Sequence, residues 1–154
     1  MRRLMLLGAA TLALLAGVAQ ADDQPFWYLQ TSVYTTHWSH DPEHNNHQNL
    51  IGVERHNADG RFIGAATFRN SYRQRTQYAY VGKRYEAASL PVCAKLSAGF
   101  IQGYRGEYRD KIPLNRYGVA PAIIPALGAH WDSVGAELVL FGNAGAMLTS
   151  GLRY

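Results

Sequence analysis

Apolar residues recur at every second position in several short stretches of the chain, including residues 92–100, 134–141 and 145–154. A period of two is typical of β-strands with one face in an apolar environment. Turn-forming pairs such as Asp59-Gly60 separate these stretches. The pattern predicts eight strands, near residues 26–37, 48–57, 61–69, 77–86, 91–103, 112–125, 127–141 (with a turn near 132) and 145–154.

Two folds have strands of this kind, a soluble periplasmic sandwich and a transmembrane barrel. An even number of strands of about ten residues is typical of outer-membrane barrels. The 10 Tyr, 3 Trp and 5 Phe residues fit the aromatic girdles of such a barrel, and the chain ends on Tyr154 with Leu148 and Leu152 at alternating positions before it. We therefore predict an all-β fold, an eight-stranded antiparallel transmembrane β-barrel of the bacterial outer membrane.

The amino terminus differs from the rest of the chain. Arg2 and Arg3 precede an apolar run over residues 4–18, and Ala19-Gln20-Ala21 is a small-x-small cleavage pattern. A transmembrane anchor would need about 20 apolar residues, and this run is shorter. The sequence predicts a secretory signal peptide at 1–21 and the barrel domain at 22–154.

Charge and cysteine content limit what the exported domain can bind and which cross-links it can form. The formal net charge of +4 falls by two when Arg2 and Arg3 are removed with the signal peptide. A weakly basic exported domain is not expected to bind nucleic acid. Cys93, the one cysteine, can form no internal disulfide, and we expect it to be packed in an apolar stretch. We expect a monomer that uses no cofactor.

Four of the six histidines lie close together, in the segment TTHWSHDPEHNNHQNL of residues 35–50. His37, His40, His44 and His47 would share a face of a helix and bind zinc, but Pro42 makes a helix here unfavourable. We expect no metal site. His37 ends a predicted strand and is a candidate catalytic residue, whereas the other three are expected in a solvated outer loop.

Two segments resemble the outer-membrane lipid A palmitoyltransferase family, PagP, namely residues 57–82 and 111–128. In that family a strand after a Gly-containing turn ends in Phe-x-Asp-Ser-aromatic, and here residues 68–72 read Phe-Arg-Asn-Ser-Tyr. Thr35-Thr36-His37 matches a Thr-x-His of the family's first strand. Ile112-Pro113-Leu114 matches the Ile-Pro-Leu that begins its Pro-rich sixth strand. The resemblance covers roughly residues 27–154.

The resemblance implies catalytic roles for His37 and Ser71, which fall on the essential histidine and serine of the family. The family's aspartate is replaced by Asn70, which can orient an imidazole or donate to an oxyanion but cannot act as a base. The amphipathic helix that precedes the family's first strand has no counterpart in residues 22–25.

The same resemblance implies a lipid-binding interior. Gly82 falls on the family glycine that limits the depth of the acyl chain; a plain strand glycine is the alternative. Pro113, Pro121 and Pro125 remove ladder donors and would open a lateral path for lipid tails. Basic residues at the predicted outer loops would attract the phosphates of lipopolysaccharide, namely Arg69, Arg73, Arg75, Arg105, Arg109, Lys111 and Arg116.

The implied reaction is transfer of a palmitoyl chain from a phospholipid donor to a hydroxyl or acyl chain of lipid A, within the outer membrane. His37 would be the general base, because imidazole titrates near neutral pH. Ser71 would be either an acylated nucleophile or a hydrogen-bond donor, and without the resemblance it would read as a turn serine. The alternatives are a lipid A deacylase or phospholipase with the same residues, and a barrel without enzymatic activity.

Overall fold

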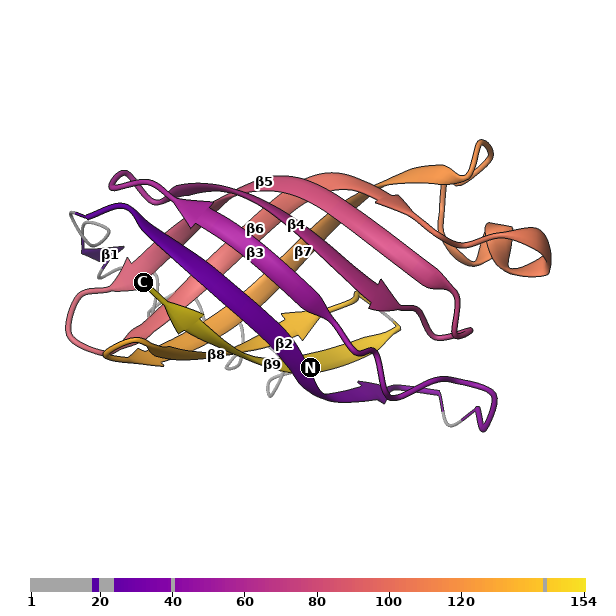
Figure 1. Cartoon of the computed structure of the whole chain (residues 1–154), viewed down its shortest axis with the longest axis horizontal. Helices are drawn as coiled ribbons and strands as arrows, with labels where there is room; N and C mark the ends of the chain where they lie inside the picture. Colours follow the sequence, from indigo (N-terminus) through magenta and orange to yellow (C-terminus); the bar gives the residue numbers. More distant parts are fainter. Residues whose placement is uncertain (1–17, 20–23, 40, 143) are drawn as a thin grey trace, which may run out of the picture.

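The computed structural model describes residues 18–19, 24–39, 41–142 and 144–154. In these residues nearly all regular structure is β-strand (Figure 1). The one helical element is a short 3₁₀ helix between β6 and β7. The elements are β1 (Val18–Ala19), β2 (Phe26–His37), β3 (Ile51–His56), β4 (Arg61–Arg69), β5 (Arg75–Ala87), β6 (Val92–Gln102), η1 (Gly106–Lys111), β7 (Val119–Trp131), β8 (Val134–Leu140) and β9 (Gly145–Arg153).

Strands β2 to β9 form a closed antiparallel barrel. Each strand pairs with the next one along the chain, and β9 pairs with β2, so that Leu152 lies opposite Leu29. Closure removes the exposed sheet edges that would otherwise promote aggregation. The predicted eight-stranded antiparallel barrel is confirmed. The short β1 pairs with β5 beside the barrel, and its residues fall within the predicted signal peptide.

The outer surface of the barrel is apolar. Side chains at alternating positions, such as Ile63, Val81 and Ile123, point outward and are 61%, 59% and 72% exposed. An uninterrupted apolar band around a barrel is the surface that a bilayer requires. Exposed aromatic side chains lie near the two ends of the strands: Trp27, Tyr85, Trp131 and Tyr154 at one end, and Tyr34, Trp38, Phe100 and Tyr117 toward the other.

The two ends of the barrel differ in their connections (Figure 1). We name the end with the segments 38–50, 70–74, 103–118 and 141–144 the loop end, and the end with the segments 57–60, 88–91 and 132–133 the turn end. In transmembrane barrels the longer loops face outward from the cell. Among the described residues, no helix is long and apolar enough to cross a membrane.

Two predicted strands have wrong boundaries. The sixth was expected at 112–125, but β7 runs from Val119 to Trp131, and the turn near 132 separates it from β8. Ile112, Pro113 and Leu114 therefore lie in the connecting loop after η1. Leu114 has a φ of 62°, a left-handed conformation that a strand does not accommodate. The apolar residues Ile112 and Leu114 beside Pro113 led to the prediction of a strand, but the chain bends at these positions and they belong to the loop.

Candidate functional site

A β-bulge in β2 decides which way His37 points. Up to Ser32, the even-numbered residues of β2 face the interior, as Tyr28 and Gln30 do. The register against β9 shifts between Ser32 and Tyr34, so that two residues oppose one on the partner strand. Beyond the bulge the odd-numbered residues face inward, including His37. A regular strand would have turned His37 toward lipid together with Trp27.

His37 and Ser71 meet at the loop end of the barrel. Ser71 lies in the turn between β4 and β5, and β3 separates these strands from β2. The distance between His37 Nε2 and Ser71 Oγ is 2.7 Å, within the range of a strong hydrogen bond. The structure therefore brings together the two residues that the sequence named as catalytic, a histidine and a serine in the geometry of a base and a nucleophile.

Asn46 completes this arrangement, and sequence reasoning missed it. Asn46 Oδ1 lies 2.8 Å from His37 Nδ1, on the opposite side of the ring from Ser71. A side chain that holds the second ring nitrogen fixes the orientation of an imidazole. Asn46 lies nine residues after His37 in the histidine-rich segment, but a loop sequence does not show which side chain folds back onto the strand.

Asn70 does not contact His37 in the way that the resemblance implied, and this prediction is corrected. Its carboxamide oxygen accepts the backbone N–H groups of Tyr72 and Gln74 at 2.9 and 3.1 Å. The side chain is 1% exposed. An Asx side chain that accepts local N–H groups stabilises a turn. Asn70 therefore shapes the turn that carries Ser71, and Asn46 takes the orienting position.

Asn45 ties the histidine-rich loop to the Ser71 turn. Its backbone N–H donates to the Ser71 carbonyl at 2.7 Å, and its Nδ2 donates to the Asn70 carbonyl at 3.3 Å. Its carboxamide oxygen accepts from the His47 backbone, and Gln48 Nε2 donates to its carbonyl at 2.9 Å. Segment 45–48 and the turn therefore form one hydrogen-bonded unit around the His37–Ser71 contact.

The other histidines of the segment have separate environments. His44 is not a solvated residue as expected: its ring packs on that of His37 with centroids 4.5 Å apart. His47 is exposed, in agreement with the prediction. His40 lies outside the described residues. The described part of the chain contains no group of three or more His, Cys, Asp or Glu side chains placed to hold a metal ion.

Tyr104 adds a second hydroxyl at Ser71. It lies in the loop between β6 and β7, and its side chain is hydrogen-bonded to Ser71. Burial, together with the nearby Tyr72, raises the pKa of Tyr104 to about 12. The hydroxyl therefore stays protonated at physiological pH and can donate to an oxygen that gains negative charge. Tyr72 also stacks on Tyr108, with ring centroids 4.1 Å apart.

The barrel interior contains a cavity of about 60 Å³ between the strands. Polar side chains such as Gln30, Ser97 and Glu54 form part of its lining. Its apolar lining consists mainly of Leu50, Phe68, Ile124, Val139, Phe141 and Met147. A slot of this kind suits a single alkyl chain in cross-section.

Gly82 faces the interior but does not itself line the slot, because the Phe62 ring lies between them. Its role in limiting the depth of the acyl chain stays a prediction. A Cβ at Gly82 would lie 2.3 Å from Phe62 Cζ and 2.5 Å from the Leu96 carbonyl oxygen. The missing side chain is therefore compensated by the Phe62 ring. Nearer the loop end, Tyr78 and Tyr80 stack with centroids 4.5 Å apart, and the Tyr78 hydroxyl lies 3.1 Å from Ser97 Oγ. Both rings line the slot.

The prolines lie on a strand edge that is only partly paired. β7 pairs with β8 only through residues 126–131, while residues 119–125 pair with β6 alone. Pro121 and Pro125 lie in this second part, with exposed side chains. A residue without an N–H leaves no donor unsatisfied at such an edge. Pro113, in contrast, lies exposed in the loop and does not belong to β7.

The predicted basic residues are all exposed at the loop end. Arg69 and Arg75 lie opposite each other on β4 and β5. Arg73 donates to the Glu43 carbonyl of the histidine-rich loop at 3.4 Å. Lys111 lies 6.0 Å from the centre of the Tyr72 ring, next to the Ser71 turn. These basic residues outnumber the exposed acidic residues of the same loops, Asp41, Glu43, Glu107 and Asp110, so the loop end carries net positive charge.

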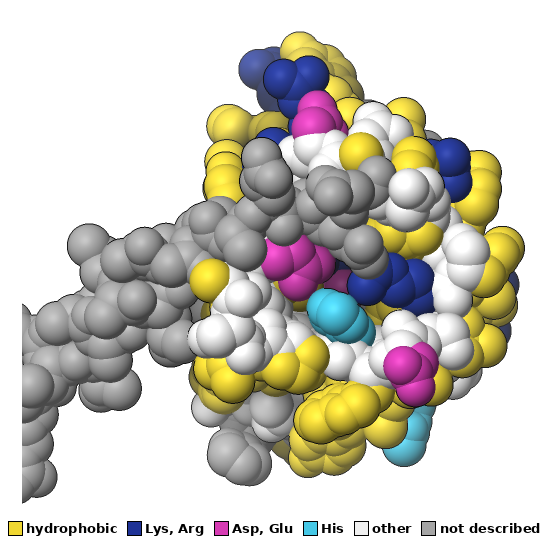
Figure 2. All heavy atoms as spheres, turned by 90° about the vertical axis from the view of Figure 1, so that its left-hand side faces the viewer, with side chains coloured by type: hydrophobic (Ala, Val, Ile, Leu, Met, Phe, Trp, Pro, Cys, Tyr) yellow, Lys and Arg dark blue, Asp and Glu magenta, His cyan; other side chains and the backbone are white. Residues whose placement is uncertain are grey.

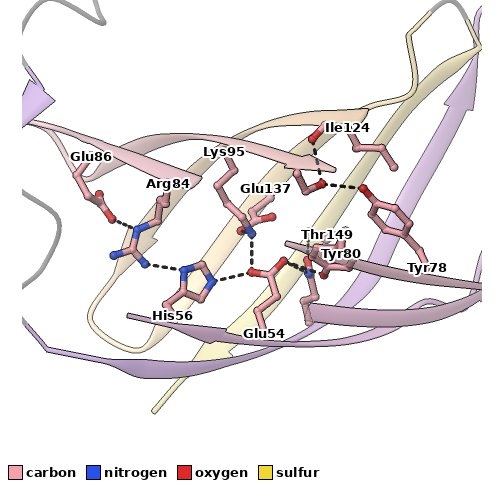
Figure 3. Close-up of polar contacts among 12 residues, drawn as sticks. Glu54, His56, Tyr78, Tyr80, Arg84, Glu86, Lys95, Ile124, Glu137 and Thr149 are labelled. Carbon is pink, nitrogen blue, oxygen red and sulfur yellow. Dashed lines mark hydrogen bonds and ion pairs between the residues drawn. The ribbon is translucent and has the colours of Figure 1, made fainter. Parts of the chain in front are cut away.

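A cluster of buried charges occupies the interior toward the turn end (Figure 3), and sequence reasoning did not predict it. Lys95 donates to Glu54 and to Glu137 at 2.6 and 2.8 Å. His56 Nε2 lies 2.7 Å from Glu54 Oε2, the same oxygen that Lys95 contacts, and Arg84 Nη1 lies 3.2 Å from His56 Nδ1. The sequence did contain a signal for the cluster, because each of these residues occupies an inward-facing position in the alternating pattern of its strand.

Figure 2 shows the turn end, where acidic, basic and histidine side chains fill the mouth of the barrel inside a rim of apolar ones. A hollow of about 30 Å³ at this end is lined by Phe26, His56, Arg84, Glu86 and Arg153 among others. Arg84 Nε lies 2.8 Å from Glu86 Oε1. Charged side chains that satisfy each other therefore fill this half of the interior.

Comparison with known proteins supports the fold alone. The chain matches no protein-family model, and no curated protein sequence matches it. A solved structure described as "De novo design of transmembrane beta-barrels" is similar, with a TM-score of 0.52 at 13% sequence identity. The similarity covers 88% of this chain and 98% of the designed one. The match to a designed barrel therefore supports the β-barrel fold and assigns no activity.

Proposed function

We propose that the chain is an outer-membrane acyltransferase that moves a palmitoyl chain from a phospholipid to a hydroxyl or acyl chain of lipid A. The observation that carries this proposal is the 2.7 Å contact between His37 Nε2 and Ser71 Oγ at the loop end of a barrel whose interior contains a mainly apolar cavity. Acyl transfer needs a base, a donor for the oxyanion and a place for the chain. His37, Tyr104 and the slot supply these three parts.

The position of the pair favours a lipid substrate over a soluble one. His37 and Ser71 lie where the apolar band of the barrel meets its polar loops, the depth at which the ester groups of a membrane lipid lie. The unpaired edges of β2 beyond residue 31 and of β7 before residue 126 both open at this level. Lipid tails can approach the slot along these edges without crossing the polar loops.

The lipid A acceptor is supported by charge. The exposed basic residues around Ser71, including Arg73 and Lys111, suit the phosphate groups of lipopolysaccharide. The cavity of about 60 Å³ is much smaller than a palmitoyl chain. Binding therefore requires side-chain movement in the slot, for which the flexible Met147 is suited.

The test is mass spectrometry of lipid A from bacteria that lack a lipid A palmitoyltransferase of their own and express this chain. The wild type should add one palmitoyl group, His37→Ala should not, and His47→Ala, an exposed histidine of the same loop, should match the wild type. A heat-modifiable gel shift would verify that each barrel is folded. Unmodified lipid A with folded wild-type protein would reject the proposal, and release of free fatty acid would then identify a hydrolase.

A further inference from the structure

The contacts of the His37 ring determine where its proton lies. A neutral imidazole has one nitrogen that donates and one that accepts. The partner of Nδ1 is Asn46 Oδ1 at 2.8 Å, and a carboxamide oxygen can only accept. Nδ1 therefore carries the hydrogen, and Nε2 presents its lone pair to Ser71 at 2.7 Å.

This protonation state fixes the direction of the second hydrogen bond. With Nε2 as an acceptor, the Ser71 hydroxyl donates its hydrogen to His37. The Tyr104 hydroxyl, which is hydrogen-bonded to Ser71, then donates to Ser71 Oγ and leaves one lone pair of this oxygen for an electrophile. A serine that served only to donate to the oxyanion would direct its hydrogen toward the substrate and away from His37. The observed contact is that of a hydroxyl about to lose its proton to a base.

We propose that Asn46 holds His37 in the Nδ1–H tautomer and that Ser71 is thereby the nucleophile that carries the acyl group between donor and acceptor. Asn46 is a positioning residue, because it acts through His37. This inference rests on the acyl transfer proposed above and adds a covalent intermediate to it.

In the first half of the reaction, Ser71 Oγ attacks the ester carbonyl carbon of the phospholipid while its proton passes to His37 Nε2. Asn46 Oδ1 keeps its bond to Nδ1–H as the ring becomes positively charged. The Tyr104 hydroxyl lies at Ser71 to donate to the tetrahedral oxyanion. The bond from the carbonyl carbon to the glycerol oxygen then breaks, and His37 returns the proton to that oxygen. Lysophospholipid leaves, and the acyl group remains on Ser71.

The second half reverses these roles. The acceptor hydroxyl gives its proton to His37 Nε2 and attacks the carbonyl carbon of the acyl-serine. The bond to Ser71 Oγ breaks, and that oxygen recovers the proton from His37. No other reactant is needed. If water replaced the acceptor, the same steps would release free fatty acid.

Asn46 is held in place although its side chain is exposed. The residues on either side of it belong to the hydrogen-bonded unit of segment 45–48: Asn45 donates to the Ser71 carbonyl, and the Gln48 carbonyl accepts from the Arg69 backbone at 2.7 Å. His44 packs on the face of the His37 ring. Asn46 and Ser71 are therefore fixed on opposite sides of His37 by the same set of contacts.

The covalent step is tested with purified protein in detergent and phospholipid alone, without lipid A. Intact-protein mass spectrometry after rapid acid quench should show a gain of one acyl group that peptide mapping places on Ser71, and Ser71→Ala should not gain it. Adding lipid A should discharge the acyl group. A wild-type enzyme that acylates lipid A while Ser71 stays unmodified throughout turnover would overturn the proposal.

The role of Asn46 is tested separately. Asn46→Leu should lower kcat roughly a hundredfold with little change in KM, while His47→Ala stays within about twofold of the wild type. Asn46→Asp keeps the acceptor and should retain activity. Its carboxylate favours the protonated imidazole, so the acidic limb of the pH–rate profile should move to higher pH. Full kcat in Asn46→Leu, or an unmoved profile in an active Asn46→Asp, would remove Asn46 from this role.

The two proposals fail in different ways. Acyl-Ser71 that forms from phospholipid but is never passed to lipid A would reject the palmitoyltransferase and keep the nucleophile. Palmitoylated lipid A without acyl-Ser71 would reject the nucleophile and keep the palmitoyltransferase.

Discussion

The two halves of the barrel interior contrast sharply. Toward the loop end, an apolar slot lies under a polar rim, and the rim side chains His37 and Ser71 are half-buried. Toward the turn end, Glu54, Lys95 and Glu137 are 2%, 6% and 7% exposed and bind each other directly. One half leaves polar groups accessible above a mainly apolar cavity, and in the other half these three charged side chains are paired with each other.

The contrast indicates that the two halves have different roles, one in the reaction and the other in the stability of the fold. Groups that must react remain at the end of the strands, where loops can bring distant residues together. Charges that only have to fill and fix the barrel lie deep inside, where removal of one partner has a large effect on folding. We therefore expect substitutions at the loop end to change activity, and substitutions in the charged cluster to change stability.

Lys95→Met should produce the largest loss of stability. It leaves Glu54 and Glu137 buried without a cation, and breaking a buried pair in this way costs about 3–5 kcal/mol. Urea unfolding in lipid vesicles, followed by tryptophan fluorescence, measures the change. The activity of the folded fraction should stay within about twofold.

Two further variants sharpen this result. Lys83→Met, on the outer side of β5, should cost no more than about 1.5 kcal/mol, because Lys83 donates one hydrogen bond to the Asp59 carbonyl. Replacing Lys95, Glu54 and Glu137 together by Met, Gln and Gln should recover much of the stability, because no unpaired charge is left. A Lys95→Met protein with normal stability and low activity would contradict the division between the two halves.

Tyr104→Phe should show the opposite behaviour. Loss of one hydrogen bond to the developing oxyanion lowers kcat about 10²–10³-fold, while the unfolding free energy should change by no more than about 1.5 kcal/mol. Tyr108→Phe, which keeps the ring stacked on Tyr72, is the matched control and should retain activity. Because the pKa of Tyr104 is raised to about 12, its hydroxyl stays protonated below that pH. The alkaline limb of the activity profile should be the same in Tyr104→Phe.

Gly82→Ala should have the smallest effect on activity. Its Cβ would meet the Phe62 ring and the backbone oxygen of Leu96, and overpacking of this kind costs about 1–3 kcal/mol. Chain-length preference should not change, because Phe62 separates this position from the slot. Thin-layer assays with phospholipids of different chain length provide the measurement.

Tyr78→Ala is the counterpart of this variant, because it removes a ring that lines the slot. It should extend the preferred acyl chain by about one to three methylene groups, each of which is worth about 1–3 kcal/mol of discrimination in an apolar pocket. If Gly82→Ala preferred a shorter acyl chain and Tyr78→Ala had an unchanged preference, Gly82 would be the residue that limits the depth of the acyl chain.

The fold could be predicted well from the sequence, and the site only in part. Strand β2 and strand β4 have the predicted boundaries, because alternation of polarity is a local property that each strand expresses by itself. The start of β7 could not be predicted, since Ile112 and Leu114 have the same local character in a loop as in a strand. His37 and Ser71 were identifiable from motifs, but Asn46 and Tyr104 lie in loops whose folded path no periodicity describes.

The sequence by itself determined an all-β chain with an even number of strands, an apolar outward face and a histidine and a serine at strand ends. Only the tertiary structure decided that His37 faces inward, because the bulge after Ser32 reverses the parity of β2. Closure of the barrel likewise decided that Asn46 rather than Asn70 orients His37, and that Phe62 fills the space over Gly82. Such contacts join residues far apart in the chain, so they depend on strand register and loop path, which local sequence patterns do not encode.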